Sequence, residues 1–175
     1  MNRRISTITL LFASLLFLAP GCGIYTMTGV ATTAKTITID QIFNNTDLAP
    51  ANLAQTFSNR LKDYYQQNSG LRVVPEVGEL AVEGVITDYR LSNMAPTASS
   101  TNAGTSPAAL TRLTIAVKIT YTDNLEPKNS FKDRQFSFYR DFDNNLSFAS
   151  VQEDLEKKIM DQILLDIFNA TVANW

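Results

Sequence analysis

The sequence predicts an α+β fold, a two-layer sandwich in which two helices pack on one face of a roughly four-stranded mixed sheet. Three observations predict it. Two segments carry apolar residues at helical spacing, several others alternate apolar and polar residues, and their order is strand, helix, short strand, three strands, helix. Two amphipathic helices and a set of one-sided strands bury all their apolar faces when both helices lie on the same side of the sheet.

The N-terminus is typical of a lipoprotein signal peptide. Arg3 and Arg4 precede an uncharged, mostly apolar stretch, residues 5–18, which is short for a membrane span. Residues 18–22, Leu-Ala-Pro-Gly-Cys, resemble a lipobox, although the leucine stands one place further from Cys22 than usual. We therefore expect cleavage of 1–21, lipidation of Cys22, a lipid-anchored tether at 22–34 and a single domain at 35–175. The alternative is a secreted protein with one unpaired thiol.

The first half of the domain predicts a strand, a helix and two more strands. Residues 35–40 alternate polar and apolar side chains as a strand does. Pro50 suits the first turn of a helix whose apolar stripe ends at Gly70. A short segment at 71–75 precedes a strand at 80–91, with a bulge expected near Gly84. The helical stripe consists of Leu53, Phe57, Leu61 and Tyr64 with Tyr65.

The second half predicts two strands and a long helix. Residues 92–109 carry no charge and little bulk, so we expect a mobile connection. Residues 113–121 alternate most clearly and should turn one face to the core. A turn and a strand at 136–142 follow. Ser150 and Glu153 have the spacing of a capping box and predict the start of the last helix.

The composition excludes several kinds of chemistry. The 175 residues include no histidine and one cysteine, so neither a histidine-containing triad nor an imidazole metal site can form. Residues from Asp141 begin like a calcium loop, but Leu146 stands where glycine is required and Gln152 where a bidentate glutamate belongs. We expect no metal and no cofactor. A hydrolase that uses two carboxylates stays open, with Glu76, Glu79 and Glu83 as candidates.

The charge balance argues against a nucleic acid partner. The chain holds 15 basic and 17 acidic residues, a formal net charge of −2. Removal of residues 1–21, which contain two arginines and no acid, makes the charge −4. Binding to a phosphate backbone needs a basic surface. Membrane attachment must then come from acyl chains rather than from a basic patch.

Four segments together resemble one known family. They are Cys-Gly-Ile-Tyr-Thr-Met-Thr-Gly at 22–29, Leu-Ala-Gln-Thr-Phe at 53–57, Leu-Thr-Arg-Leu-Thr-Ile-Ala-Val at 110–117 and Asp-Ile-Phe-Asn-Ala-Thr-Val-Ala-Asn-Trp at 166–175. In their order and spacing the chain resembles the LptE family of lipopolysaccharide-assembly lipoproteins. The resemblance implies a non-enzymatic protein with two helices on a four-stranded sheet. It further implies a plug inside the LptD β-barrel that helps the barrel fold and helps deliver lipopolysaccharide to the cell surface.

The resemblance also implies a location and an anionic ligand. Gly23 is not the aspartate that accompanies inner-membrane retention, so we expect the periplasmic side of the outer membrane. Lipopolysaccharide carries phosphates, and an acidic chain can bind it only through a local basic cluster. The candidates are Arg90, Arg112, Lys118, Lys132 and Arg134. Two alternatives stay open: these residues are ordinary surface charges, or the lipoprotein binds peptidoglycan or another lipid without a barrel partner.

Overall fold

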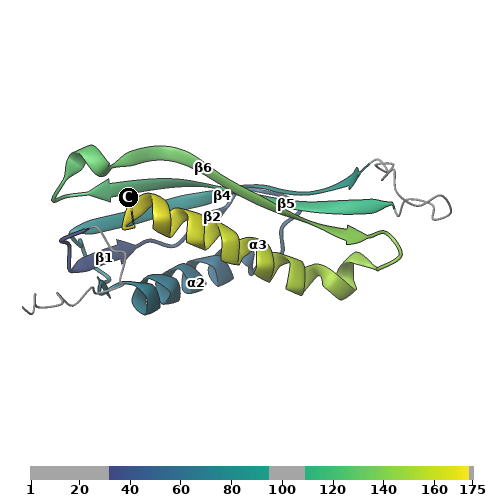
Figure 1. Cartoon of the computed structure of the whole chain (residues 1–175), viewed down its shortest axis with the longest axis horizontal. Helices are drawn as coiled ribbons and strands as arrows, with labels where there is room; N and C mark the ends of the chain where they lie inside the picture. The colour runs from purple at the N-terminus through teal and green to yellow at the C-terminus, as the bar shows by residue number, and fades with distance from the viewer. Residues whose placement is uncertain (1–31, 95–108, 174–175) are drawn as a thin grey trace, which may run out of the picture.

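A computed structural model describes residues 32–94 and 109–173 (Figure 1). The signal peptide, Cys22 and most of the tether lie outside these residues, as does most of the uncharged connection at 92–109. The elements are β1 (Thr36–Ile39), β2 (Phe43–Asn44), α2 (Leu53–Asn68), β3 (Arg72–Val73), β4 (Leu80–Met94), β5 (Leu110–Asp123), a 3₁₀ turn η1 (Pro127–Asn129), β6 (Phe131–Asp143) and α3 (Phe148–Thr171).

The sheet is mixed, and both helices cover the same face of it, as the sequence predicted (Figure 1). Its strands run in the order β3-β1-β4-β5-β6, and β2 pairs with β4 next to β1. The first strands are parallel to their neighbours, while β4, β5 and β6 form an antiparallel meander. The sheet has six strands rather than about four. The two-residue strand β3 lies within the short segment expected at 71–75, whereas the two-residue strand β2 was not expected.

The alternation along β5 separates the core from the other face. Val117 is fully buried, whereas its neighbour Lys118 is exposed. The same parity holds for a column of buried side chains, Leu113, Ile115, Val117, Ile119 and Tyr121. Because side chains alternate between the faces of a sheet, one face of β5 meets the helices and the other meets solvent. The predicted assignment of faces on this strand is confirmed.

Both helices bury the stripes that predicted them. In α2 the buried residues are Leu53, Ala54, Phe57, Ser58, Leu61 and Tyr65, and in α3 they are Leu155, Ile159, Met160, Ile163, Leu164, Ile167, Phe168 and Thr171. The helices meet through the Tyr65 hydroxyl, which lies 2.6 Å from Oγ1 of Thr171. Edge-to-face packing of Tyr65 and Phe168, with ring centroids 5.3 Å apart, closes the same contact.

Two local predictions are wrong. The predicted capping box at Ser150 lies inside α3, which begins at Phe148 with Ser147 as its N-cap. The Ser150 hydroxyl donates to the Ser147 carbonyl, at 2.7 Å, and therefore bonds to a carbonyl of the first turn instead of capping backbone N–H groups. The bulge does not lie at Gly84. The register between β4 and β5 shifts between Ile86 and Asp88, where Thr87 is the extra residue.

Gly84 has a different structural role. A Cβ at this position would lie 2.6 Å from Cδ1 of Ile119 and 2.6 Å from the carbonyl oxygen of Lys118. Such distances are shorter than van der Waals contact, so β4 can approach β5 and Ile42 this closely only with glycine here.

The uncharged connection is shorter than predicted. Ser92 to Met94 extend β4, and Leu110 to Arg112 extend β5, in continuous antiparallel register. These residues pair because backbone hydrogen bonding continues along the ladder whatever the side chains are. The three strands of the meander therefore reach well beyond β1 and α2 toward one end of the molecule (Figure 1).

Candidate functional site on the open face of the sheet

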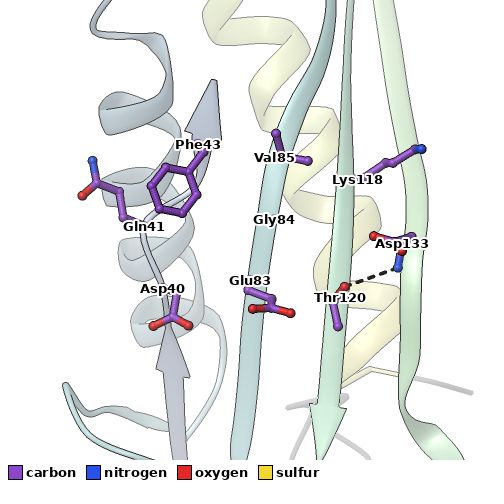
Figure 2. A pocket seen from close by; sticks show the side chains of 9 residues that line it. All are labelled: Asp40, Gln41, Phe43, Glu83, Gly84, Val85, Lys118, Thr120 and Asp133. Atoms are coloured by element: carbon purple, nitrogen blue, oxygen red, sulfur yellow. Dashed lines mark hydrogen bonds between the residues drawn. The ribbon is translucent and has the colours of Figure 1, made fainter. Parts of the chain in front are cut away.

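The face of the sheet turned away from both helices, here called the outer face, carries polar side chains. Glu83 of β4 pairs in register with Thr120 of β5, and Val85 pairs with Lys118. Farther along, Arg112 pairs with Asp141 and Thr114 with Tyr139 of β6. In Figure 2 the helices lie behind this part of the sheet, and Glu83 and Lys118 on its other side are exposed. The outer face is therefore the candidate interaction surface.

A groove of about 450 Å³ crosses the outer face. Its lining comes from β1–β2, β4, β5 and β6, and consists of Asp40, Gln41, Phe43, Glu83, Gly84, Val85, Lys118, Thr120 and Asp133 (Figure 2). The lining contains three carboxylates and one ammonium group, so the groove is acidic. Phe43 projects at its rim with 68 % of its surface exposed. The groove suits a partner with hydrogen-bond donors or positive charge better than it suits a phosphate.

A bulge in β6 brings Asp133 to the groove. Ile119 pairs with Arg134 and Tyr121 with Phe131, so two residues of β6 oppose Thr120. Asp133 takes a positive φ of 52°, a conformation that aspartate adopts more easily than most residues. Its backbone N–H donates to the Thr120 hydroxyl at 3.3 Å.

Arg112 is held by two neighbours on the outer face. Its Nε and an Nη donate to the two oxygens of Asp141 at 2.7 and 2.9 Å. Its guanidinium carbon lies 3.6 Å from the centre of the Tyr139 ring. Bidentate bonding and stacking on an aromatic ring are the geometries that arginine favours. Hydrogen bonds from Arg112 lower the pKa of the Asp141 carboxyl below its ordinary value.

The five basic candidates do not form one cluster with a shared environment. Arg90 pairs with Asp88 at 2.8 Å, and Arg112 pairs with Asp141. Lys118 lines the acidic groove. Lys132 is exposed on β6. The guanidinium carbon of Arg134 lies 5.3 Å from the ring centres of both Phe131 and Phe136. These two phenylalanines pair in register with buried residues of β5 and lie on the helix side of the sheet. Their role in binding lipopolysaccharide stays a prediction.

The three glutamates considered for catalysis have separate environments. Oε2 of Glu79 accepts the backbone N–H groups of Lys35, at 2.5 Å, and Thr36, at 3.2 Å. The Thr36 hydroxyl accepts the N–H of Glu79 in return. The bond from Lys35, followed by that from Thr36, lowers the pKa of the Glu79 carboxyl. This carboxylate fastens the start of β1, close to the tether, while Glu83 lies in the groove.

Two observations on the described residues bear on other kinds of site. Across 32–94 and 109–173, no three acidic or sulfur side chains are close enough together to hold a metal ion. In the same ranges, no helix combines the length and apolar character needed to cross a membrane.

Sequence reasoning missed most of the groove. Asp40, Phe43 and Asp133 were not among the candidates, because the groove forms only where β2 joins the edge of β4 and β6 bulges. Asp141 and Tyr139 were also missed as partners of Arg112. Tyr139 and Asp141 are two residues apart in the predicted strand, so the sequence does indicate that they share one face of the sheet.

Comparison with protein families gives one match. The model of the LptE family, described as lipopolysaccharide-assembly, matches residues 34–171, which is well over half of the chain.

This chain belongs to the LptE family.

Membership confirms the resemblance seen in the sequence and places the chain among the lipoproteins of lipopolysaccharide assembly, a family of assembly proteins rather than enzymes. No curated protein matches the chain.

Solved structures share the fold of this LptE-family chain. The uncharacterized lipoprotein B of Nitrosomonas europaea is 13 % identical, with a TM-score of 0.52 over 85 % of this chain and 88 % of its own. A hypothetical protein of Chlamydia trachomatis is 11 % identical, with a TM-score of 0.51 over 81 % of this chain and 99 % of its own. At these identities the likeness concerns the fold alone.

Proposed function

We propose that this chain is an outer-membrane lipoprotein of the lipopolysaccharide translocon. Anchored by acyl chains on Cys22 at the periplasmic side, it serves as plug and assembly factor for an LptD-type β-barrel and assists delivery of lipopolysaccharide to the cell surface. The observation that carries the proposal is the match of the LptE family model to residues 34–171. The lipobox-like segment directly before Cys22 supports the anchor.

The outer face is suited to a place inside a barrel. Side chains that line the lumen of an outer-membrane barrel are polar. A plug must therefore present a polar surface to the barrel wall. The outer face offers such a surface, which extends across the sheet from Glu83 on β4 to Asp141 on β6. Apolar side chains meanwhile stay between the sheet and the two helices, where the core already buries them.

The basic residues differ in the ion pairs that a lipopolysaccharide phosphate would have to break in order to bind them. A phosphate would have to displace Asp141 from Arg112 and Asp88 from Arg90. Lys118 lies among the carboxylates of the acidic groove. For Lys132, within the described part of the chain, no ion pair has to be broken. We therefore expect Lys132→Ala to lower retention of labelled lipopolysaccharide more than Arg90→Ala does. Equal retention by the two variants and the wild-type chain would remove Lys132 from this role.

Copurification from native membranes tests the proposal. A C-terminally tagged chain should bring down an outer-membrane β-barrel in detergent, identified by mass spectrometry, and the mature N-terminus should be an acylated Cys22. Cys22→Ser, the matched variant without an anchor, should lose acylation. Depletion of the protein should lower the amount of assembled barrel and make cells sensitive to large hydrophobic antibiotics.

Two outcomes would contradict the proposal. One is recovery of peptidoglycan or another envelope component without any barrel, which would favour the lipoprotein that acts alone. The other is depletion of the chain without any defect in barrel assembly or in the permeability of the outer membrane.

A further inference from the structure

One edge of β4 lacks a neighbouring strand along nearly half of its length in the part of the chain that the structure describes. Leu80 to Val82 pair with β1, and Val85 and Ile86 pair with β2. The last contact on this side is the N–H of Asn45, which donates to the Ile86 carbonyl at 3.0 Å. From Asp88 to Met94, β4 pairs only with β5 in these residues. We call residues 88–94 on this side the open edge.

Three residues of the open edge turn their backbone groups outward. Tyr89, Leu91 and Asn93 pair in register with residues of β5 whose backbone groups face β6, because hydrogen bonding alternates along an antiparallel ladder. Their own N–H and C=O groups therefore face away from β5. Such groups bond to water or to another extended chain.

The side chains around the open edge hold it in place but do not prevent it from pairing with another chain. The Tyr89 hydroxyl donates to Glu156 of α3 at 2.7 Å, which fixes this part of β4 on the helix layer. Asp88 and Arg90 pair with each other on the outer face at 2.8 Å, so the edge presents no net charge there. Leu91 remains 43 % exposed on the helix side.

The opposite edge of the sheet is different. β6 carries six charged residues in two groups near its ends, namely Lys132, Asp133, Arg134, Arg140, Asp141 and Asp143. Charges along an edge strand are a common protection against pairing with another chain. The open edge of β4 lacks this protection, apart from the Asp88–Arg90 pair that neutralises itself.

The chain itself is a competing occupant of the open edge. The N-terminal segment enters the sheet at Thr36, and Ile37 lies level with Leu80. From there to Asp88 is eight residues, about 26 Å of strand, a length that the fourteen residues 22–35 can span. Pairing of this segment with the open edge would also slow the exchange of the outward amides in the free chain. Residues 95–108 contain two prolines and no side chain larger than asparagine, so they offer nothing to cover Leu91.

A second copy is another competing occupant. Antiparallel pairing of two open edges about Leu91 would place Leu91 opposite Leu91, Asp88 opposite Met94 and Arg90 opposite Ser92. This arrangement gains one apolar cross-strand pair at Leu91 and brings no opposite charges together. A dimer of this kind would already slow the exchange of the outward amides in the free chain.

We propose that the open edge of β4, Asp88 to Met94, is completed by an extended, uncharged segment of the barrel partner, which adds a strand to the sheet and sets an apolar side chain against Leu91. The partner's identity rests on the proposed function, while the extended form of the segment follows from the backbone groups of Tyr89, Leu91 and Asn93. Addition of a strand to an exposed sheet edge is a recurrent mode of protein recognition.

Hydrogen exchange of single backbone amides tests this pairing directly. The full mature chain is compared free in detergent and in its copurified complex with the barrel. The outward amides of Tyr89, Leu91 and Asn93 should exchange quickly in the free chain and at least about tenfold more slowly in the complex. The outward amides of Ser137 and Tyr139 on the edge of β6 serve as the matched control and should slow much less. Fast exchange at all three in the complex, or slow exchange already in the free chain, would overturn the proposal.

A proline variant tests the same pairing by removal of one donor. Leu91→Pro deletes an outward N–H without removing a bond to β5, and should reduce copurification of the barrel about tenfold, the effect of one net hydrogen bond and its neighbours. Leu91→Ala, which keeps the N–H, and Ser137→Pro, the equivalent change on the other edge, should reduce it less than threefold. Equal recovery by all of them would overturn the proposal.

The outcomes separate the two levels of inference. If the wild-type chain recovers no barrel, both the proposed function and this pairing fail. If it recovers the barrel but the outward amides of the open edge stay fast, the pairing alone fails. Should Leu91→Pro not fold, which its melting curve would reveal, the exchange experiment on the wild-type chain decides the matter.

Discussion

The hydroxyl of Tyr65 donates a hydrogen bond to Oγ1 of Thr171 and so joins α2 to α3 inside the core. Oγ1 of Thr171 also lies 2.9 Å from the Ile167 carbonyl and 3.1 Å from that of Phe168. A threonine hydroxyl has one proton, which serves a helix carbonyl here, so the tyrosine must be the donor. Burial raises the pKa of Tyr65 far above its ordinary value, and the phenol therefore stays protonated in any physiological buffer.

This relationship predicts unequal effects of two conservative changes. Tyr65→Phe removes the donor but leaves Thr171 bonded to its helix, and should lower the free energy of unfolding by about 1 kcal/mol. Thr171→Val leaves a fully buried phenol without its partner, and should cost about 1–3 kcal/mol. Urea unfolding of the two variants measures the difference. A smaller loss for Thr171→Val would show that the phenol finds another partner.

The faces of β5 predict a second contrast between neighbouring residues. Val117 is fully buried, so Val117→Asp should prevent folding, since burial of an unpaired carboxylate costs several kcal/mol out of a total stability of about 5–15. Lys118→Ala lies on the exposed face and should change the stability by less than about 0.5 kcal/mol. Thermal melts of both proteins test the assignment, and similar melting temperatures would refute it.

The fold could be predicted because its elements have strong periodicity. The alternation from Leu113 to Tyr121 identified a one-sided strand, and the stripe from Leu155 to Ile167 identified a helix with one buried face. These patterns persist because each apolar side chain loses contact with water only when its face meets another layer.

The local details could not be predicted because tertiary contacts decide them. Ser150 has the spacing of a cap, yet the chain already turns into α3 at Phe148, where that face packs near β6. The groove depends on two pairings of distant segments, Phe43 with Val85 and Lys118 with Gln135. No periodicity within one segment contains that information.

Gly84 predicts a third contrast, with Gly70 as its control. Gly84→Ala would bring a Cβ within 2.6 Å of a backbone carbonyl, and the strands must move apart to accept it. We expect a loss of about 1–3 kcal/mol in the free energy of unfolding. Gly70→Ala meets no atom within 4 Å and should be neutral or slightly stabilising. Equal losses at both positions would mean that β4 and β5 are less closely packed at Gly84 than described.

The pairing of Arg112 with Asp141 predicts a stability difference that depends on pH. Because Arg112 lowers the pKa of the Asp141 carboxyl, the folded state favours the ionised form of Asp141. In the unfolded chain this interaction is absent, and the carboxyl has its ordinary pKa. The stabilisation is therefore complete above the unfolded pKa of aspartate, about 3.9, and disappears as the pH falls through the lower pKa of the folded state.

Asp141→Asn should accordingly melt below the wild-type protein at pH 7, because it replaces an ion pair by a neutral amide. The two proteins should melt at the same temperature in acid below the pKa of folded Asp141, where the wild-type carboxylate is itself protonated. Arg112→Gln removes the other partner and should follow the same pH dependence, although it also loses the stacking on Tyr139 and keeps a small deficit in acid. Added salt should shrink the difference at pH 7, since both side chains lie at the surface. Melting curves of the three proteins from pH 7 downward distinguish the ion pair from packing alone, because a deficit of Asp141→Asn that stayed constant until the protein unfolds in acid would leave the charge of Asp141 with no part in stability.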